Sequence, residues 1–333
     1  MDLYNAIQYH KFDEAIKLVD STTDLNVIIL SETLLIACSK IYYSYETPQV
    51  NVLAKKLIDL GCDLNLSDNN RRTPLMVAIQ SRNYELSKLL IDKSVTRQCD
   101  INLQDVDGRC ALYYATEQNF VEVVDYLIKH NCDLHLSVSG FSPFYRAMDY
   151  QFYTCAHRIL TAPLLNLNYM SGGLTIIMHG LLYLHHHISI TDVLTTGNYN
   201  MELGSFSGDK ILIYAITSGY NDVVKILINK GCSIDTYYNI YADKWINPLK
   251  IAIERHKIEI VGTLIDKYIE NKNITFLNNI NGYKLTNSQI CQIRKLYEKQ
   301  FMTLLVDTTH DMSISFQNNG DINIIKLFTE FIE

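Results

Sequence analysis

One short pattern recurs along the chain, in which a bulky apolar residue is followed three positions later by a small one. Its clearest copy is the segment 73–78, Thr-Pro-Leu-Met-Val-Ala. The small residues that mark the eight copies are Ala6, Ala37, Ala78, Ala115, Ala147, Gly180, Ala215 and Ala252. Successive marks lie 31, 41, 37, 32, 33, 35 and 37 residues apart. A period of this length indicates a stack of similar helical units, each too small to bury its apolar face alone.

Local signals predict two helices in each unit. Thr73 is suited to cap a helix that begins at Pro74, where a missing N–H group costs nothing. The second helix shows an apolar stripe at spacings of three and four residues, for example Leu86, Leu89 and Leu90. Gly61 and Gly231 follow such helices, where a left-handed residue is favoured. Asp and Asn residues at 63–65 and 100–102 then favour a turn into a protruding hairpin.

These segments resemble the ankyrin family, whose signature opens with Thr-Pro-Leu-His-x-Ala and closes with Gly-Ala-Asp-Val-Asn. The resemblance extends from about residue 2 to 268 and is best at 68–135 and 205–268. It is weakest at 170–204, where Gly180 replaces the alanine and the second helix is reduced to 190–194. The resemblance implies an all-α solenoid of stacked helix pairs with short β-hairpin tips and a helical C-terminal cap.

We expect three parts in the chain. Residues 1–30 are predicted to form an N-terminal capping repeat, and residues 31–268 about seven repeats. The inward face of the cap is predicted to comprise Phe12, Ala15, Ile16, Leu18 and Val19. Residues 269–333 depart from the repeat and are predicted to be a helical C-terminal cap or docking segment, with a capping box at 286–289.

Composition argues against several classes of partner. The net charge of −7 disfavours nucleic acid, because phosphate binding needs clustered Lys and Arg. The N-terminus lacks the features of a signal peptide, and no apolar stretch approaches the ~18 residues of a membrane span. The eight cysteines form no Cys-x-x-Cys pair and read as small buried side chains in a reducing compartment. We therefore expect a cytoplasmic monomer that contacts neither nucleic acid nor membrane.

No pattern of catalysis is present in the sequence. The motifs Gly-x-Ser-x-Gly, Gly-x-x-x-x-Gly-Lys-Ser/Thr and His-Glu-x-x-His are all missing, which predicts a protein without enzymatic activity or cofactor. The run 185–187, His-His-His, does not predict a metal site, because consecutive helical residues point in different directions.

The resemblance implies that a protein partner binds the hairpin tips and the exposed side of the first helices. The matching positions are Asn69, Asn70, Arg72, Gln80, Asp107, Arg109, Glu117, Phe141, Asp149, Tyr150, Asp209, Lys244 and Trp245. Aromatic and arginine side chains are the usual interface anchors, so Arg72, Arg109, Phe141, Tyr150 and Trp245 are favoured. The resemblance further implies that Asn65 and Asn102 occupy a position open to hydroxylation by an asparaginyl dioxygenase, with a hairpin hydrogen bond as the alternative role.

Two functional hypotheses follow. The first is a protein-binding scaffold, and the Ile-, Asn- and Tyr-rich repeats resemble those of large DNA viruses such as poxviruses or amoebal giant viruses, which suggests a host protein as partner. The second is a substrate-recruiting adaptor of a cullin-type ubiquitin ligase. Poxviral relatives carry an F-box-like segment opening with Leu-Pro, whereas this chain has the sequence Gly-Asp-Ile-Asn-Ile-Ile at 320–325. The adaptor hypothesis is therefore the weaker of the two.

Overall fold

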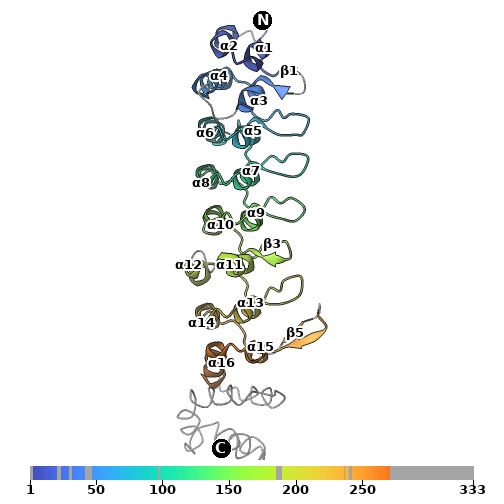
Figure 1. Cartoon of the computed structure of the whole chain (residues 1–333), viewed down its shortest axis with the longest axis vertical. Coiled ribbons are helices and arrows are strands. Elements are labelled where there is room, and N and C mark those ends of the chain that lie inside the picture. Colours follow the sequence, from blue (N-terminus) through green and yellow to red (C-terminus); the bar gives the residue numbers. More distant parts are fainter. Residues whose placement is uncertain are drawn as a thin grey trace, which may run out of the picture. The chain divides into compact units, whose positions relative to one another are not determined.

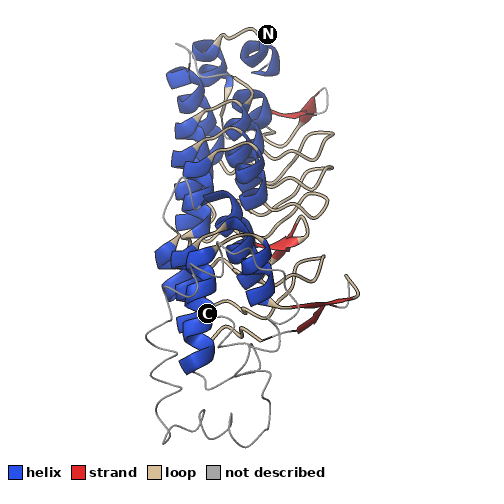
Figure 2. Cartoon of the chain, turned by 60° about the horizontal axis from the view of Figure 1, so that its bottom comes forward, coloured by secondary structure: helices blue, strands red, loops and turns tan. Residues whose placement is uncertain are grey.

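The computed structural model describes residues 3–20, 24–29, 32–41, 47–96, 98–184, 190–235, 237–239 and 242–270. Contacts divide the chain into an N-terminal unit up to Ser189 and a C-terminal unit from Ile190 onward. Within each unit, the helices form two columns, and hairpins and loops project from one of them (Figures 1 and 2). The predicted all-α fold of stacked helix pairs with hairpin tips is confirmed.

The N-terminal unit stacks inner helices, which bear the hairpins, beside outer helices. The inner helices are α1 (Leu3–Gln8), α3 (Leu34–Ser39), α5 (Pro74–Gln80), α7 (Ala111–Glu117), α9 (Pro143–Asp149) and α11 (Ile176–Leu184). The outer helices are α2 (Phe12–Leu18), α4 (Thr47–Asp59), α6 (Tyr84–Asp92), α8 (Val121–Lys129) and α10 (Tyr153–Leu160). Each inner helix contacts the inner helix of the next repeat, so the core continues through the unit.

The C-terminal unit repeats this arrangement over a shorter span. Its helices are α12 (Thr191–Thr196), α13 (Ile211–Ser218), α14 (Asn221–Asn229), α15 (Pro248–Glu254) and α16 (Ile258–Glu270). Helix α14 packs between α12 and α16, while α13 packs on α15. The predicted C-terminal cap, its capping box at 286–289 and the histidine run 185–187 lie outside the described residues.

Among the described residues, three hairpins contain paired antiparallel strands. They are β1 (Ile28–Ile29) with β2 (Glu32–Thr33), β3 (Met170–Ser171) with β4 (Leu174–Thr175), and β5 (Tyr237–Asn239) with β6 (Lys244–Ile246). The other described hairpin tips are turns. Isolated bridges close two of them, Val138 with Phe141 and Gly204 with Lys210, and a backbone hydrogen bond from Asp105 to Arg109 closes another.

The predicted start and stop signals act as expected. The Oγ1 atom of Thr73 accepts a hydrogen bond of 3.4 Å from the N–H of Met76, and Pro74 begins α5. Gly61 and Gly231 adopt φ values of +91° and +90° after the outer helices. These signals account for the start of α5 and for the turns that follow α4 and α14.

The small residues of the repeat are buried where inner helices meet. Ala78, Ala115 and Ala147 have no exposed surface. At the weakest register, a Cβ atom on Gly180 would lie 3.2 Å from Cδ2 of Leu160 in α10. Glycine therefore replaces alanine there because the neighbouring outer helix approaches closely.

The N-terminal repeat differs from the prediction at one position. Phe12, Ala15 and Val19 are buried as expected, and Ile16 is half-buried, but Leu18 is 44% exposed. At 3.6 residues per turn, position 18 lies about 90° away from the mean direction of positions 12, 15 and 19. The prediction that Leu18 faces inward is wrong for this reason.

Candidate functional site

Helices α7, α9 and α11 and the hairpins before α9 and α11 bring aromatic and charged side chains together. We call this set the aromatic cluster. It comprises Tyr113, Phe141, Tyr145, Arg146, Tyr150, His179 and Tyr183. Ring centroids lie 4.6 Å apart for Phe141 and Tyr145, and 5.0 Å apart for Tyr145 and His179. These rings therefore join the repeats of α9 and α11, and Tyr113 on α7 extends the cluster to a third repeat.

A glycine in the β3–β4 turn makes room for two of these rings. A Cβ atom on Gly172 would lie 2.9 Å from Cε1 of Phe141 and 2.9 Å from Cε2 of Tyr145. Such distances are closer than carbon atoms can approach without displacement. The rings therefore rest against the turn of the next repeat, which restricts their motion.

Arg146 occupies the centre of the other half of the cluster. Its guanidinium carbon lies 4.3 Å from the ring centroid of Tyr150 and 5.7 Å from that of Tyr113. Its terminal nitrogens lie 3.5 Å from Glu117 and 3.2 Å from Asp149. Among the described residues, the buried Nε atom of Arg146 has no hydrogen-bond partner. The cation is held by aromatic faces and carboxylates from two repeats.

Several predicted binding residues adjoin this cluster or each other. Glu117, Asp149 and Tyr150 all contact Arg146. Arg109 pairs with Asp107 at 3.0 Å. The structure thus gathers these positions along α7, α9 and their hairpins.

Arg72 is engaged within its own repeat. Its Nε atom donates to the Oδ2 atom of Asp68 at 2.9 Å, and its NH1 group donates to Gln80 at 2.9 Å. Asn69 and Asn70 are exposed at the tip of the same hairpin. The four predicted residues of this repeat, Asn69, Asn70, Arg72 and Gln80, therefore lie near one another. Arg72 already uses much of its hydrogen-bonding capacity on Asp68 and Gln80.

The remaining predicted residues belong to the C-terminal unit. Asp209 accepts a hydrogen bond of 3.2 Å from the amide of Asn239, whose backbone pairs with Lys244. Trp245 lies in β6, and its side chain is outside the described part. These residues share neighbouring hairpins within their unit.

Sequence reasoning missed five members of the aromatic cluster. They are Tyr113, Tyr145, Arg146, His179 and Tyr183. The first four occupy the two positions between the bulky and the small residue of the repeat, where the clearest copy has Met76 and Val77. The aromatic or charged side chains at these positions were the sequence signal that could have identified them as members of the cluster.

The two asparagines expected to be open to hydroxylation join neighbouring repeats. The Oδ1 atom of Asn65 accepts a hydrogen bond of 2.7 Å from the N–H of Asp100, and that of Asn102 accepts one of 2.8 Å from Asp133. At the next junction, Nε2 of His135 accepts from the N–H of Asn166 at 2.9 Å. Hydroxylation stays a prediction, whereas the hydrogen-bonding role extends between repeats rather than within one hairpin.

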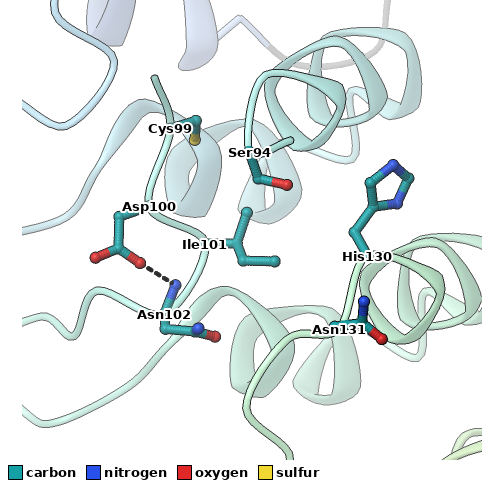
Figure 3. A pocket seen from close by; sticks show the side chains of 7 residues that line it. All are labelled: Ser94, Cys99, Asp100, Ile101, Asn102, His130 and Asn131. Carbon is teal, nitrogen blue, oxygen red and sulfur yellow. Dashed lines mark hydrogen bonds between the residues drawn. The ribbon is translucent and has the colours of Figure 1, made fainter. Parts of the chain in front are cut away.

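A pocket of about 370 Å³ lies beside the ends of α6 and α8. Its lining comprises Ser94, Cys99, Asp100, Ile101, Asn102, His130 and Asn131. Figure 3 shows His130 and Asn131 on one side and Asp100 and Asn102 on the other. The Nδ1–H group of His130 is within 2.9 Å of the carbonyl of Tyr126, and Nε2 lies 3.5 Å from Asp92. These polar groups are largely engaged with the chain itself.

The described residues contain no group of His, Cys, Asp and Glu side chains that could hold a metal ion. Within the same ranges, every helix is too short or too polar to cross a lipid bilayer.

Comparison with known proteins gives one result. The family model described as ankyrin repeats (three copies) matches residues 3–105, 94–171 and 178–276. These matches cover more than half of the chain. No curated protein matches the sequence.

Proposed function

The chain belongs to the ankyrin-repeat family, and from that membership we propose that it is a non-enzymatic scaffold that binds a partner protein through the aromatic cluster. The observation that carries the proposal is the exposure of large rings there. Phe141, Tyr150 and Tyr183 are 39%, 40% and 49% exposed. Aromatic and arginine side chains supply most of the binding energy at protein interfaces.

The cluster is suited to binding because its side chains are already ordered. Phe141 is packed on Tyr145, Tyr183 is stacked on His179, and Tyr150 lies against Arg146. A side chain that is held before binding loses less conformational entropy when the partner arrives. The surface therefore offers both apolar area and preorganisation.

The setting of the proposed interaction is the inside of a cell. The seven cysteines of the described residues are free and buried, which supports a reducing compartment. A finer proposal is that the chain is viral and that its partner is a host protein. It rests on the Ile-, Asn- and Tyr-rich composition of the repeats. The ligase-adaptor hypothesis concerns residues 269–333, most of which lie outside the described part, so the proposal depends on the repeats alone.

Affinity capture from a cell lysate tests the proposal. The full chain is compared with a double variant, Phe141→Ala with Tyr183→Ala, and with a control, Val95→Ala with Leu164→Ala. Val95 and Leu164 are 75% and 58% exposed and lie in loops outside the cluster. We expect the cluster variant to lose a captured protein that the control retains, by at least about tenfold, since hot-spot truncations often cost 2 kcal/mol or more.

Thermal unfolding followed by circular dichroism shows whether both variants remain folded. If the folded cluster variant and the control capture the same proteins in the same amounts, the cluster is not the binding surface. Size-exclusion chromatography with light scattering tests the expected monomeric state in the same preparations.

A further inference from the structure

His179 is a buried side chain with one hydrogen-bonded ring nitrogen and one that has no partner among the described residues. It lies in α11, is 1% exposed, and its Nε2–H group donates a hydrogen bond of 2.6 Å to the carbonyl of Ser171. Its Nδ1 atom is buried and has no hydrogen-bond partner among the described residues. Because the carbonyl only accepts, the proton of the neutral ring lies on Nε2 and Nδ1 is unprotonated.

The ring of His179 supports two members of the aromatic cluster. Tyr145 of α9 meets it edge to face, with an interplanar angle of 78°, and Tyr183 of α11 stacks on it at 21°. The imidazole therefore joins α9 to α11 and holds Tyr183 in place. Removing or displacing it would change the surface that we propose binds the partner.

Within the part of the chain that the structure describes, no carboxylate is in hydrogen-bond contact with the imidazole. The titratable or charged side chains on the elements packed against α11 and on α11 itself are Tyr145, Arg146, Asp149, Tyr153, Cys155, His157, Arg158 and Tyr183. Arg146 and Asp149, the two charged residues of α9, are paired with each other. On α10, Arg158 is paired with Asp125 of α8.

Protonation would therefore create a second N–H group, on Nδ1, for which the described residues provide no acceptor. An unsatisfied buried donor is unfavourable, and one that carries charge is more so. Burial accordingly lowers the pKa of His179 below its ordinary value, and the hydrogen bond to Ser171 opposes that shift only in part.

We propose that neutral His179 is a positioning residue that seats α11 on α9, and that acidification loosens this contact and weakens binding at the aromatic cluster. The first half stands on the geometry of the N-terminal unit, whereas the second rests on the proposed function. The folded-state pKa is lowered, so the stabilisation is complete above the unfolded value of about 6.5 and is lost as the pH falls below it.

Hydrogen exchange tests whether the packing of α11 on α9 depends on pH. The full chain is measured at about pH 7.5 and pH 5.0, on either side of the ordinary histidine pKa. We expect protection factors of the α11 amides to fall at least about tenfold between these values in the wild type. His179→Gln keeps an N–H donor for Ser171 but cannot titrate, so its protection should change by less than about twofold. His157→Gln, on α10, controls for the loss of a histidine and should behave as the wild type.

Equal losses of protection in the wild type and in His179→Gln would overturn the proposal. If the glutamine variant fails to fold, the ¹⁵N chemical shifts of the wild-type imidazole decide instead. A ring that is already protonated at about pH 6.5 would contradict the requirement for a neutral form.

The binding half is tested with the protein captured by the wild-type chain. If acid loosens α11 and lowers capture in the wild type and in His157→Gln, but neither signal changes with pH in His179→Gln, both halves are supported. If α11 loosens but capture does not change, the switch stands and the aromatic cluster is not the binding surface.

Discussion

The hydroxyl of Tyr114 donates a hydrogen bond of 2.6 Å to the Oδ2 atom of Asp105, and both side chains are buried. The Oδ1 atom of the same carboxylate accepts from the N–H groups of Asp107 and Arg109. Asp105 thus closes its hairpin with one oxygen and joins it to α7 with the other. In the preceding repeat, Arg72 fills the place of the tyrosine by donating to Asp68.

Replacing Tyr114 with Phe should therefore destabilise the hairpin of this repeat. The loss is expected to be about 2 kcal/mol, because a hydrogen bond to a buried charged group is removed without relieving the burial of the charge. Hydrogen exchange of residues 105–109 measures the local effect, since repeat proteins can open one repeat at a time. Tyr84→Phe is the matched control, because no hydrogen bond is seen for its hydroxyl among the described residues. Equal protection of this hairpin in both variants would show that the bond contributes nothing.

A second buried carboxylate, that of Glu32, should stabilise α1 in the N-terminal repeat. Glu32 is 5% exposed, and its Oε1 atom accepts hydrogen bonds of 2.9 Å from Tyr4 and 3.1 Å from Gln8, while Lys40 pairs with the other oxygen. The change Glu32→Gln places an amide donor against Lys40 and should cost about 1–3 kcal/mol in the stability of α1.

Exchange of the α1 amides provides the measurement for this change. The control is Glu14→Gln, which removes a surface pair with Lys11 at 3.9 Å and should cost no more than about 1 kcal/mol. Burial, together with Glu32, raises the pKa of Tyr4 to about 12. Loss of the Glu32 charge should lower that value, and this is detectable by tyrosinate absorbance. An α1 helix equally protected in both variants would contradict the role given to Glu32.

Much of the fold followed from local rules that the sequence states directly. The 33-residue recurrence predicted the inner helices, and Thr73 with Pro74 predicted where one of them begins. The division of the chain between Ser189 and Ile190 was not predicted. It falls before the short helix α12, where the repeat pattern is weakest, and packing rather than local propensity determines how such a register is accommodated.

The candidate site was predictable only in part. Phe141 and Tyr150 stood out because they are aromatic residues at positions where the family resemblance implies partner binding, and aromatic side chains are common interface anchors. Tyr145 and His179 did not, because a single sequence leaves open which of the two residues between the bulky and small positions meets the next repeat. The position of Tyr145 also depends on Gly172 in the turn of the next repeat, which the repeat pattern does not mark.

The ladder of hydrogen bonds between repeats predicts that His135 can be exchanged for asparagine. His135 takes the place held by Asn65 and Asn102 at the earlier junctions, and its Nδ1 atom lies 3.4 Å from Asp133. The variant His135→Asn should keep an acceptor for the N–H of Asn166, whereas His135→Ala should lose about 1 kcal/mol. Exchange of the Asn166 amide should accelerate several-fold in the alanine variant alone. Faster exchange in the asparagine variant as well would mean that the imidazole has a role beyond accepting this bond.

The buried cysteines should be unreactive in the folded chain. Burial raises the pKa of Cys38 and Cys99 to about 12. At pH 8 such a thiol is ionised in about one molecule in ten thousand, compared with about a quarter for a thiol of ordinary pKa. Because the folded-state pKa is raised, stability should be lost as the pH rises above the unfolded value of about 8.5. Iodoacetamide labelling followed by mass spectrometry should therefore track unfolding in urea. Rapid modification of Cys38 without denaturant would disprove the assignment.

Gly172 and Gly140 form a matched pair for testing the order of the aromatic cluster. Both have left-handed backbone conformations, with φ values of +58° and +83°. A Cβ atom on Gly172 would meet the rings of Phe141 and Tyr145 at 2.9 Å, whereas one on Gly140 would meet nothing within 4 Å. Each alanine variant should lose about 1 kcal/mol through backbone strain. Only Gly172→Ala should also displace the two rings, which would change the near-ultraviolet circular dichroism of the tyrosines and reduce capture of the partner. If Gly140→Ala alters both signals equally, backbone strain accounts for the effect and contact with the rings does not.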